Sequence, residues 1–275
     1  MTAQPRIPAA EQSAARAGGH WILARLGKKV LRPGGRETTE FLLDNVPLQG
    51  STVIEFAPGL GVTAKEILSR RPSRYIGVDE DADACANVRA NIAAVAAGPS
   101  GSHEVINAAA TASGLPDATA DVIVGEAMLT MTTDKHKKEI MAEAARLLRP
   151  GGLYAIHELC LNPDTISAEH ATAIQRELAT SIKVNARPLT VPEWADIARS
   201  CGFEVIDCYR ADMALLSPGR NIRDEGIKVR ITLGGEPRFL PQGSRYFRQK
   251  FPALLVFPRT IPAARYKVKC PGFCS

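Results

Sequence analysis

Apolar residues in the middle of the chain follow two alternating patterns. Short, nearly continuous apolar runs are typical of buried strands, and they occur at 52–57, 74–80, 103–110, 120–128 and 152–159. Between them, apolar residues recur every three or four positions, as on one face of a helix, over 62–71, 81–97 and 134–150. Strands that alternate with helices form a parallel sheet covered on both faces. We therefore predict a Rossmann-like, doubly wound α/β fold.

The alternation changes after Leu161. A helical pattern over 167–185 leads into no apolar strand, so we predict an insertion or lid above the carboxyl edge of the sheet, where open α/β sheets bind ligands. A helix over 190–201 and a strand over 203–211 then restore the pattern. The run 252–257 predicts a last strand, antiparallel to the others, and two helical patterns within 20–46 predict N-terminal helices.

The net charge of +5 is concentrated at the C-terminal end. Residues 218–275 hold 12 Lys and Arg against 3 Asp and Glu, which gives +9 there and leaves −4 for the first 217 residues. Basic residues interleaved with Tyr246, Phe247 and Phe251 suit an anionic membrane surface, a phosphate or an acidic substrate. We favour the simpler interpretation, in which the aromatic rings pack inward and the charges form a solvated face.

Cysteine spacing and hydropathy limit the classes of protein to which the chain can belong. The six cysteines show no C-x-x-C spacing, so the sequence predicts neither a disulfide framework nor a metal site. No apolar run is long enough to span a bilayer, and residues 1–20 lack the apolar region of a signal peptide. We therefore expect a cytoplasmic protein that holds no metal ion.

A glycine-containing loop follows the first predicted strand and opens the first helix of the alternation. Gly59, Gly61 and Ala64 match the dinucleotide fingerprint G-x-G-x-x-A, which favours a nicotinamide or flavin cofactor. Glu55 opposes that interpretation, because a carboxylate beside the loop repels a pyrophosphate but attracts a sulfonium and an ammonium group. Asp79, at the end of the second strand, suits ribose hydroxyls in either case. The loop therefore favours S-adenosylmethionine over NAD.

Four segments, in this order, resemble the class I S-adenosylmethionine-dependent methyltransferases, specifically the small-molecule branch with a UbiE-like core. They read VIEFAPGLG, GVDED, SGLPDATADVIVGEAML and AARLLRPGGLYAIHE, and the resemblance covers roughly residues 30–210. It implies S-adenosylmethionine as cofactor and assigns the methionine moiety to Glu55, Ala57, Gly59 and Gly61, the ribose to Asp79 and the adenine side to Glu80.

The adenine side departs from the family pattern. Relatives commonly read Gly-Asp-Ala where this chain has Ala110, Thr111 and Ala112, and their aspartate accepts a hydrogen bond from the adenine amino group. Thr111 can still accept one hydrogen bond through its uncharged hydroxyl. We therefore keep Thr111 and Ala112 among the predicted cofactor-binding residues.

The predicted domain organisation follows from these motifs. A chain of 275 residues with 45% apolar content supports one sizeable core, so we predict a single domain. Its parts are an N-terminal helical cap over 1–50, a cofactor-binding core over 51–161, a helical insertion or lid over 162–190, and the rest of the sheet with the basic tail over 191–275.

Methyl transfer is an in-line displacement, so an enzyme contributes mainly alignment and exclusion of water, and a base only for some acceptors. The candidate catalytic residues are Glu126, His157 and Glu158, at the ends of the fourth and fifth strands. Glu126 is also a candidate contact to the cofactor. Side-chain alternation sends His157 and Glu158 to opposite faces. Each of the three has a structural alternative as a hydrogen-bonded support, Glu158 as the cap of a neighbouring turn.

The function predicted from the sequence is methyl transfer from S-adenosylmethionine to a small-molecule acceptor. An NAD-dependent oxidoreductase is a second candidate, opposed by Glu55 and by the lack of a Tyr-x-x-x-Lys pair. A third is a non-catalytic module that binds S-adenosylmethionine or RNA, supported only by the basic tail. No Asn-Pro-Pro-Tyr-like tetrapeptide stands at Gly125–Met128, so we expect no nucleic-acid partner.

Overall fold

The structure is a computed structural model that describes residues 35–95, 102–182, 185–211 and 255–258. The N-terminal leader and most of the basic tail lie outside these residues, and so do the predictions made for them, including a contact between the tail and a membrane. Within the described ranges, no helix has both the length and the apolar character needed to cross a membrane.

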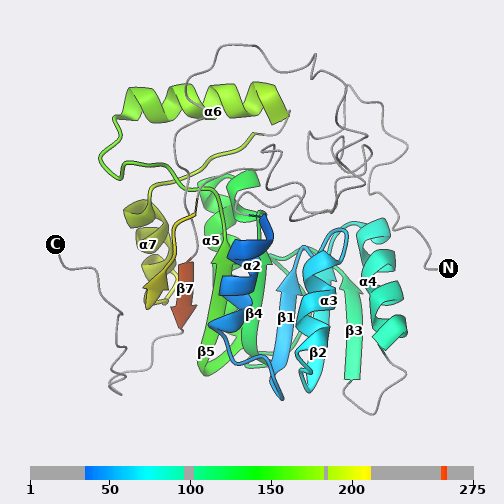
Figure 1. The fold of residues 1–275 in the computed structure, drawn as a ribbon. Coiled ribbons are helices and arrows are strands. Elements are labelled where there is room, and N and C mark those ends of the chain that lie inside the picture. The colour runs from blue at the N-terminus through cyan, green and yellow to red at the C-terminus, as the bar shows by residue number, and fades with distance from the viewer. Residues whose placement is uncertain (1–34, 96–101, 183–184, 212–254, 259–275) are drawn as a thin grey trace.

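Five parallel strands form the centre of the sheet, in the order β3-β2-β1-β4-β5 (Figure 1). Their bounds are β1 Thr52–Phe56, β2 Arg74–Asp79, β3 Ser102–Asn107, β4 Ala120–Glu126 and β5 Leu148–His157. The order reverses between β1 and β4, which is where open α/β sheets bind ligands beyond the carboxyl ends of the strands. The predicted Rossmann-like α/β class is confirmed. Two short segments, β6 (Asp207–Cys208) and β7 (Leu255–Pro258), extend the sheet beyond β5, with β7 antiparallel to both neighbours.

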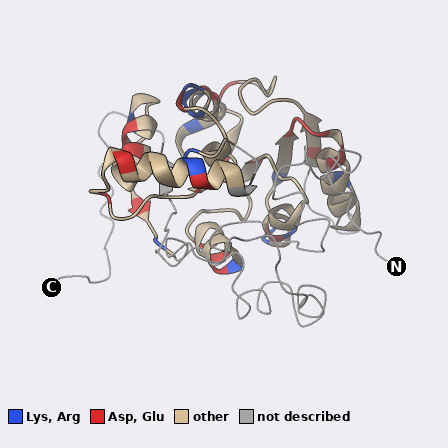
Figure 2. Cartoon of the chain, turned by 90° about the horizontal axis from the view of Figure 1, so that it is seen from above, with Lys and Arg blue, Asp and Glu red and all other residues tan. Residues whose placement is uncertain are grey.

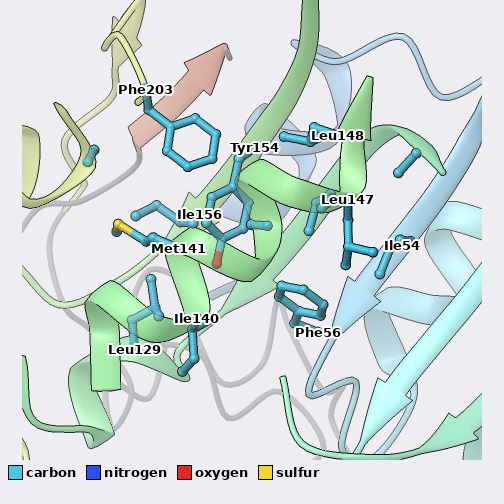
Figure 3. Packing of buried hydrophobic residues seen from close by; sticks show 14 of the residues in the cluster. Ile54, Phe56, Leu129, Ile140, Met141, Leu147, Leu148, Tyr154, Ile156 and Phe203 are labelled. Atoms are coloured by element: carbon cyan, nitrogen blue, oxygen red, sulfur yellow. The ribbon is translucent and has the colours of Figure 1, made fainter. Parts of the chain in front are cut away.

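Helices cover both faces of this sheet. The first face carries α2 (Gly35–Asp44), α3 (Val62–Ser69) and α4 (Ala82–Val95), and the second carries α5 (Asp134–Leu147) and α7 (Val191–Ser200). On β5, Ala155 packs into the core of the first face, whereas Tyr154 and Ile156 pack into that of the second, as the two-residue alternation of a strand requires. Figure 3 shows the second core, with the Tyr154 ring near Phe56 and Phe203.

Several element boundaries differ from the sequence prediction. The helix expected to continue to Pro150 ends at Leu147, because β5 begins at Leu148 and passes through Pro150 and Gly151. Proline lacks the N–H that a helix needs and is tolerated at irregular strand positions, and the β4–β5 pairing has a register shift at this end. The strand expected over 203–211 shortens to the two residues of β6.

Helix α6 (Ala168–Ile182) follows β5 and crosses above the carboxyl ends of the strands (Figure 1). It packs through a small apolar cluster of its own, in which Ile174 and Leu178 contact Leu161 and the partly buried Met131. Viewed from above, few charged residues lie along it (Figure 2). The segment containing α6 also closes on itself, because Leu161 N donates to Leu189 O over 2.9 Å.

The buried tyrosines of the two cores give a test of the packing. Among the described residues, the fully buried Tyr154 hydroxyl has no hydrogen-bond partner, whereas the Tyr75 hydroxyl donates to Glu55 Oε2 over 2.6 Å. Removing an unsatisfied buried group recovers its desolvation cost, so Tyr154→Phe is expected to raise the free energy of unfolding by about 1 kcal/mol. Tyr75→Phe, the matched control, is expected to lower it by about 1.5–3 kcal/mol, since it removes a bond to a charged acceptor. Urea unfolding of both variants measures this, and a less stable Tyr154→Phe would contradict it.

Candidate functional site

Strand alternation brings the predicted polar residues to one side of the sheet edge. Glu55 lies two residues after Val53, Glu126 two after Val124 and His157 two after Ala155, and all three apolar residues belong to the core that packs against α2, α3 and α4. Because the strands are parallel, their carboxyl ends meet at the same edge. The sequence spacing within each strand therefore determines which side chains meet.

A cavity of about 690 Å³ opens at this edge. The predicted residues that line it are Glu55, Ala57, Gly59, Asp79, Glu80, Thr111 and Glu126. Four other predicted residues, Gly61, Ala112, His157 and Glu158, are not part of its wall. The cavity thus gathers residues from the ends of β1, β2 and β4 and from the segment after β3. Among the described residues, no group of three or more His, Cys, Asp or Glu side chains could hold a metal ion.

The glycine-containing loop forms the floor beside β1. Ala57, Gly59 and Gly61 all have positive φ, at 51°, 54° and 71°, a region that glycine adopts at little cost. Gly61 caps the start of α3, and its carbonyl accepts a hydrogen bond from Asn91 Nδ2 over 2.7 Å. Gly61 therefore shapes the loop from behind the cavity wall rather than within it.

Two acids are held in place close to this loop. Asp79 accepts hydrogen bonds from Gly59 N and Asp81 N, each over 3.0 Å, and burial raises the pKa of its carboxyl group. Glu55 accepts from the Tyr75 hydroxyl, and burial together with the charge of Glu55 raises the pKa of that hydroxyl well above its usual value. Tyr75 therefore stays protonated and acts as a hydrogen-bond donor to Glu55.

Glu126 lies at the centre of a buried hydrogen-bond cluster. Its Oε1 accepts from Thr39 Oγ1 over 2.6 Å and lies 3.0 Å from His157 Nδ1, and its Oε2 accepts from Thr63 Oγ1. These partners come from α2, β5 and α3. The structure thus places His157 behind Glu126, where it contacts the carboxylate rather than the cavity.

Glu158 points to the opposite face, as the alternation predicted. Its Oε1 accepts from Met128 N and Leu129 N, and its Oε2 accepts from Thr130 N and Thr130 Oγ1, at 2.7 to 3.0 Å. Burial raises the pKa of this carboxyl group, and the hydrogen bonds from Thr130, Leu129 and Met128 oppose that shift. This geometry matches the structural alternative for Glu158, the cap of a neighbouring turn.

Sequence reasoning missed the wall on the α5 side. Met128, Met131, Thr132, Thr133 and His136 line the cavity there. Beneath them, the fully buried Lys137 donates to Thr132 O over 2.7 Å and lies 5.6 Å from the Trp194 ring, and burial lowers its pKa. Thr133 caps the start of α5, and the predicted start of this helix shortly after the fourth strand was the available signal that its first turn lies at the ligand edge.

Comparisons with known proteins agree with this geometry. Residues 53–152 match the family described as a methyltransferase domain. An uncharacterised protein from Haemophilus influenzae is 38% identical over 213 residues, which cover 76% of this chain and 81% of the relative. The chain belongs to the class I S-adenosylmethionine-dependent methyltransferases.

Solved structures show the same fold at low identity. A candidate sarcosine dimethylglycine methyltransferase from Galdieria sulphuraria has a TM-score of 0.63 at 14% identity, covering 88% of this chain and 98% of the other. Geranyl diphosphate C-methyltransferase from Streptomyces coelicolor A3(2) has a TM-score of 0.59 at 13% identity, covering 82% and 76%. At these identities the likeness establishes the fold alone.

The cavity suits the cofactor of this methyltransferase family. S-adenosylmethionine carries a sulfonium and an ammonium group, and the described wall contains Glu55, Asp79, Glu80, Asp81 and Glu126 but no Lys or Arg. Opposite charges favour binding in a partly buried site. The enzyme thus offers an acidic wall and a loop of small residues through which backbone can approach a ligand closely.

Substitution of Gly61 tests the loop of this methyltransferase. A Cβ at Gly61 would lie 2.3 Å from Asn91 Nδ2, whereas a Cβ at Gly50, which has a similar φ of +73°, meets nothing within 4 Å. Gly50→Ala is therefore expected to cost only the left-handed backbone strain, about 1–2 kcal/mol. Gly61→Ala should lower the free energy of unfolding by clearly more than Gly50→Ala does, because Asn91 must also move. Urea unfolding compares the two, and equal losses would show that the contact with Asn91 is unimportant.

Proposed function

We propose that this methyltransferase transfers the methyl group of S-adenosylmethionine to a small-molecule acceptor bound in the 690 Å³ cavity. The observation that carries the proposal is the cavity itself, which lies at the sheet reversal between β1 and β4 with acids on one wall and Met128, Met131 and Thr132 on another. The names of two structural neighbours describe action on sarcosine and dimethylglycine and on geranyl diphosphate, which are small molecules.

The proposed cofactor contacts follow the order of the strands. Asp79 would accept hydrogen bonds from the ribose hydroxyls, and Glu80 and Thr111 would lie beside the adenine. All three residues line the cavity at the ends of β2 and β3. Glu55, Ala57 and Gly59 would bind the methionine moiety at the end of β1. Gly61 and Ala112 support the surrounding backbone from outside the wall.

The bound cofactor supplies an electrophilic methyl group on sulfur. The chain's own residues align the acceptor with that group and exclude water, which can contribute several kcal/mol to a displacement. Of the three candidate catalytic residues, Glu126 lines the cavity, His157 contacts Glu126 and Glu158 bonds to backbone. The proposal therefore assigns the direct role to Glu126 and supporting roles to the other two.

Calorimetric titration tests the cofactor assignment. S-adenosylmethionine and its demethylated product S-adenosylhomocysteine are expected to bind with at least tenfold higher affinity than NAD, because the acids repel a pyrophosphate. Asp79→Asn should weaken binding of both adenosyl ligands, since an amide oxygen is a weaker acceptor than a carboxylate for ribose hydroxyls. The control Asp196→Asn changes an exposed acid on α7 and should leave binding unchanged. Comparable affinity for NAD would contradict the proposal.

Hydrogen exchange tests α6 as a lid. The helix packs through a separate apolar cluster that reaches the cavity wall at Met131, so ligand in the cavity should order it. Amide exchange over 168–182 is expected to slow when S-adenosylhomocysteine and an acceptor are bound, whereas exchange in β1 should change little because β1 is fully buried. Unchanged exchange in α6 at saturation would make it a static cover.

A further inference from the structure

The cluster around Glu126 has an arrangement that ordinary packing does not require. Thr39 on α2, Thr63 on α3 and His157 on β5 converge on one carboxylate from three separate elements. Thr39 and Thr63 are 0% and 5% exposed, and the side chains of His157 and Glu126 are 1% and 6% exposed. Glu126 and Thr63 nevertheless line the cavity. A largely buried carboxylate is thus held by three elements at the edge of the ligand site.

The chemistry of the three partners determines what Glu126 can do. Among the described residues, two hydroxyls donate to its oxygens, and His157 Nδ1 lies 3.0 Å from Oε1. Hydrogen bonds donated to the oxygens stabilise the ionised form of a carboxylate relative to its protonated form. Glu126 therefore suits a fixed negative charge better than the proton transfer of a general base. Thr39 and His157 do not line the cavity and act on the ligand through Glu126, as positioning residues, whereas Thr63 both bonds to Glu126 and lines the cavity.

The position of Glu126 along the sheet edge sets where this charge acts. Asp79, Glu55 and Glu126 lie at the carboxyl ends of β2, β1 and β4, which are consecutive neighbours in the sheet. If the ribose lies at Asp79 and the methionine moiety at Glu55, Glu126 lies on the side away from the ribose, beside the methyl group. This step rests on the proposed function.

We infer that Glu126 is a fixed anion that favours an amine as the methyl acceptor. In that reaction the nitrogen lone pair forms the new N–C bond while the S–C bond breaks and its electron pair stays on sulfur. The positive charge moves from sulfonium to nitrogen, and a proton then leaves the ammonium to water. A preorganised carboxylate beside that nitrogen stabilises the developing charge. The described wall, which has five carboxylates and no Lys or Arg, disfavours an anionic acceptor group at the same place.

Sinefungin provides a direct probe on the full-length protein, because it carries a protonated amine where S-adenosylmethionine carries its methylated sulfur. Calorimetry should show that the unmodified protein prefers sinefungin to S-adenosylhomocysteine. Glu126→Gln, which keeps the shape and removes the charge, should reduce this preference at least about tenfold while S-adenosylhomocysteine affinity changes less than about threefold.

A second pair of variants isolates the positioning role and covers the case in which Glu126→Gln does not fold. Thr39→Val should reduce the preference for sinefungin several-fold, and Thr39→Ser should restore it, since only the serine keeps the hydroxyl. Thr52→Val, a buried threonine at the opposite end of β1, serves as the control and should leave the preference unchanged.

The outcomes separate the two proposals. If neither adenosyl ligand binds the unmodified protein, the proposed cofactor site is wrong. If both bind but sinefungin is not preferred, or the preference survives Glu126→Gln and Thr39→Val, the cofactor site stands and the fixed-anion inference is overturned.

Discussion

The site depends on one geometric constraint, the two-residue alternation of side chains along parallel strands. Glu55, Asp79, Glu126 and His157 are in phase with residues that bury against α2, α3 and α4, so their polar groups arrive together where the strands end. A one-residue slip in any strand would turn its polar group to the opposite face of the sheet. The continuous core on both faces is therefore what holds the acids in register.

Two buried charges hold the loop that follows β4. Glu158 binds the backbone of residues 128–130, and Lys137 binds the carbonyl of Thr132. Burial raises the pKa of Glu158 and lowers that of Lys137; hydrogen bonds oppose the first shift, and Asp134 and Glu158 oppose the second. Backbone that carries Met128, Met131 and Thr132 into the cavity wall is thereby fixed without help from a regular strand or long helix.

The sequence predicts the sheet well because apolar periodicity is a local signal. The five parallel strands, the loop at Gly59 and the acids at Glu55 and Asp79 all follow from neighbouring residues. The Glu126 cluster could not be predicted in the same way, since Thr39 and Thr63 lie 87 and 63 residues away from it and nothing in their own segments marks them. The end of α5 was misplaced because β5 includes Pro150, where the strand is irregular.

The closed base of the segment that contains α6 has an evolutionary consequence. Leu161 and Leu189 are bonded to each other, and Arg187 N is bonded to Thr130 O, so the chain leaves and re-enters the domain at nearly one place. For such a closed loop, doubling the length costs only about 0.6 kcal/mol of closure entropy. The segment between Leu161 and Leu189 can therefore be lengthened or replaced during evolution, which changes what covers the cavity while the sheet and its acids stay the same.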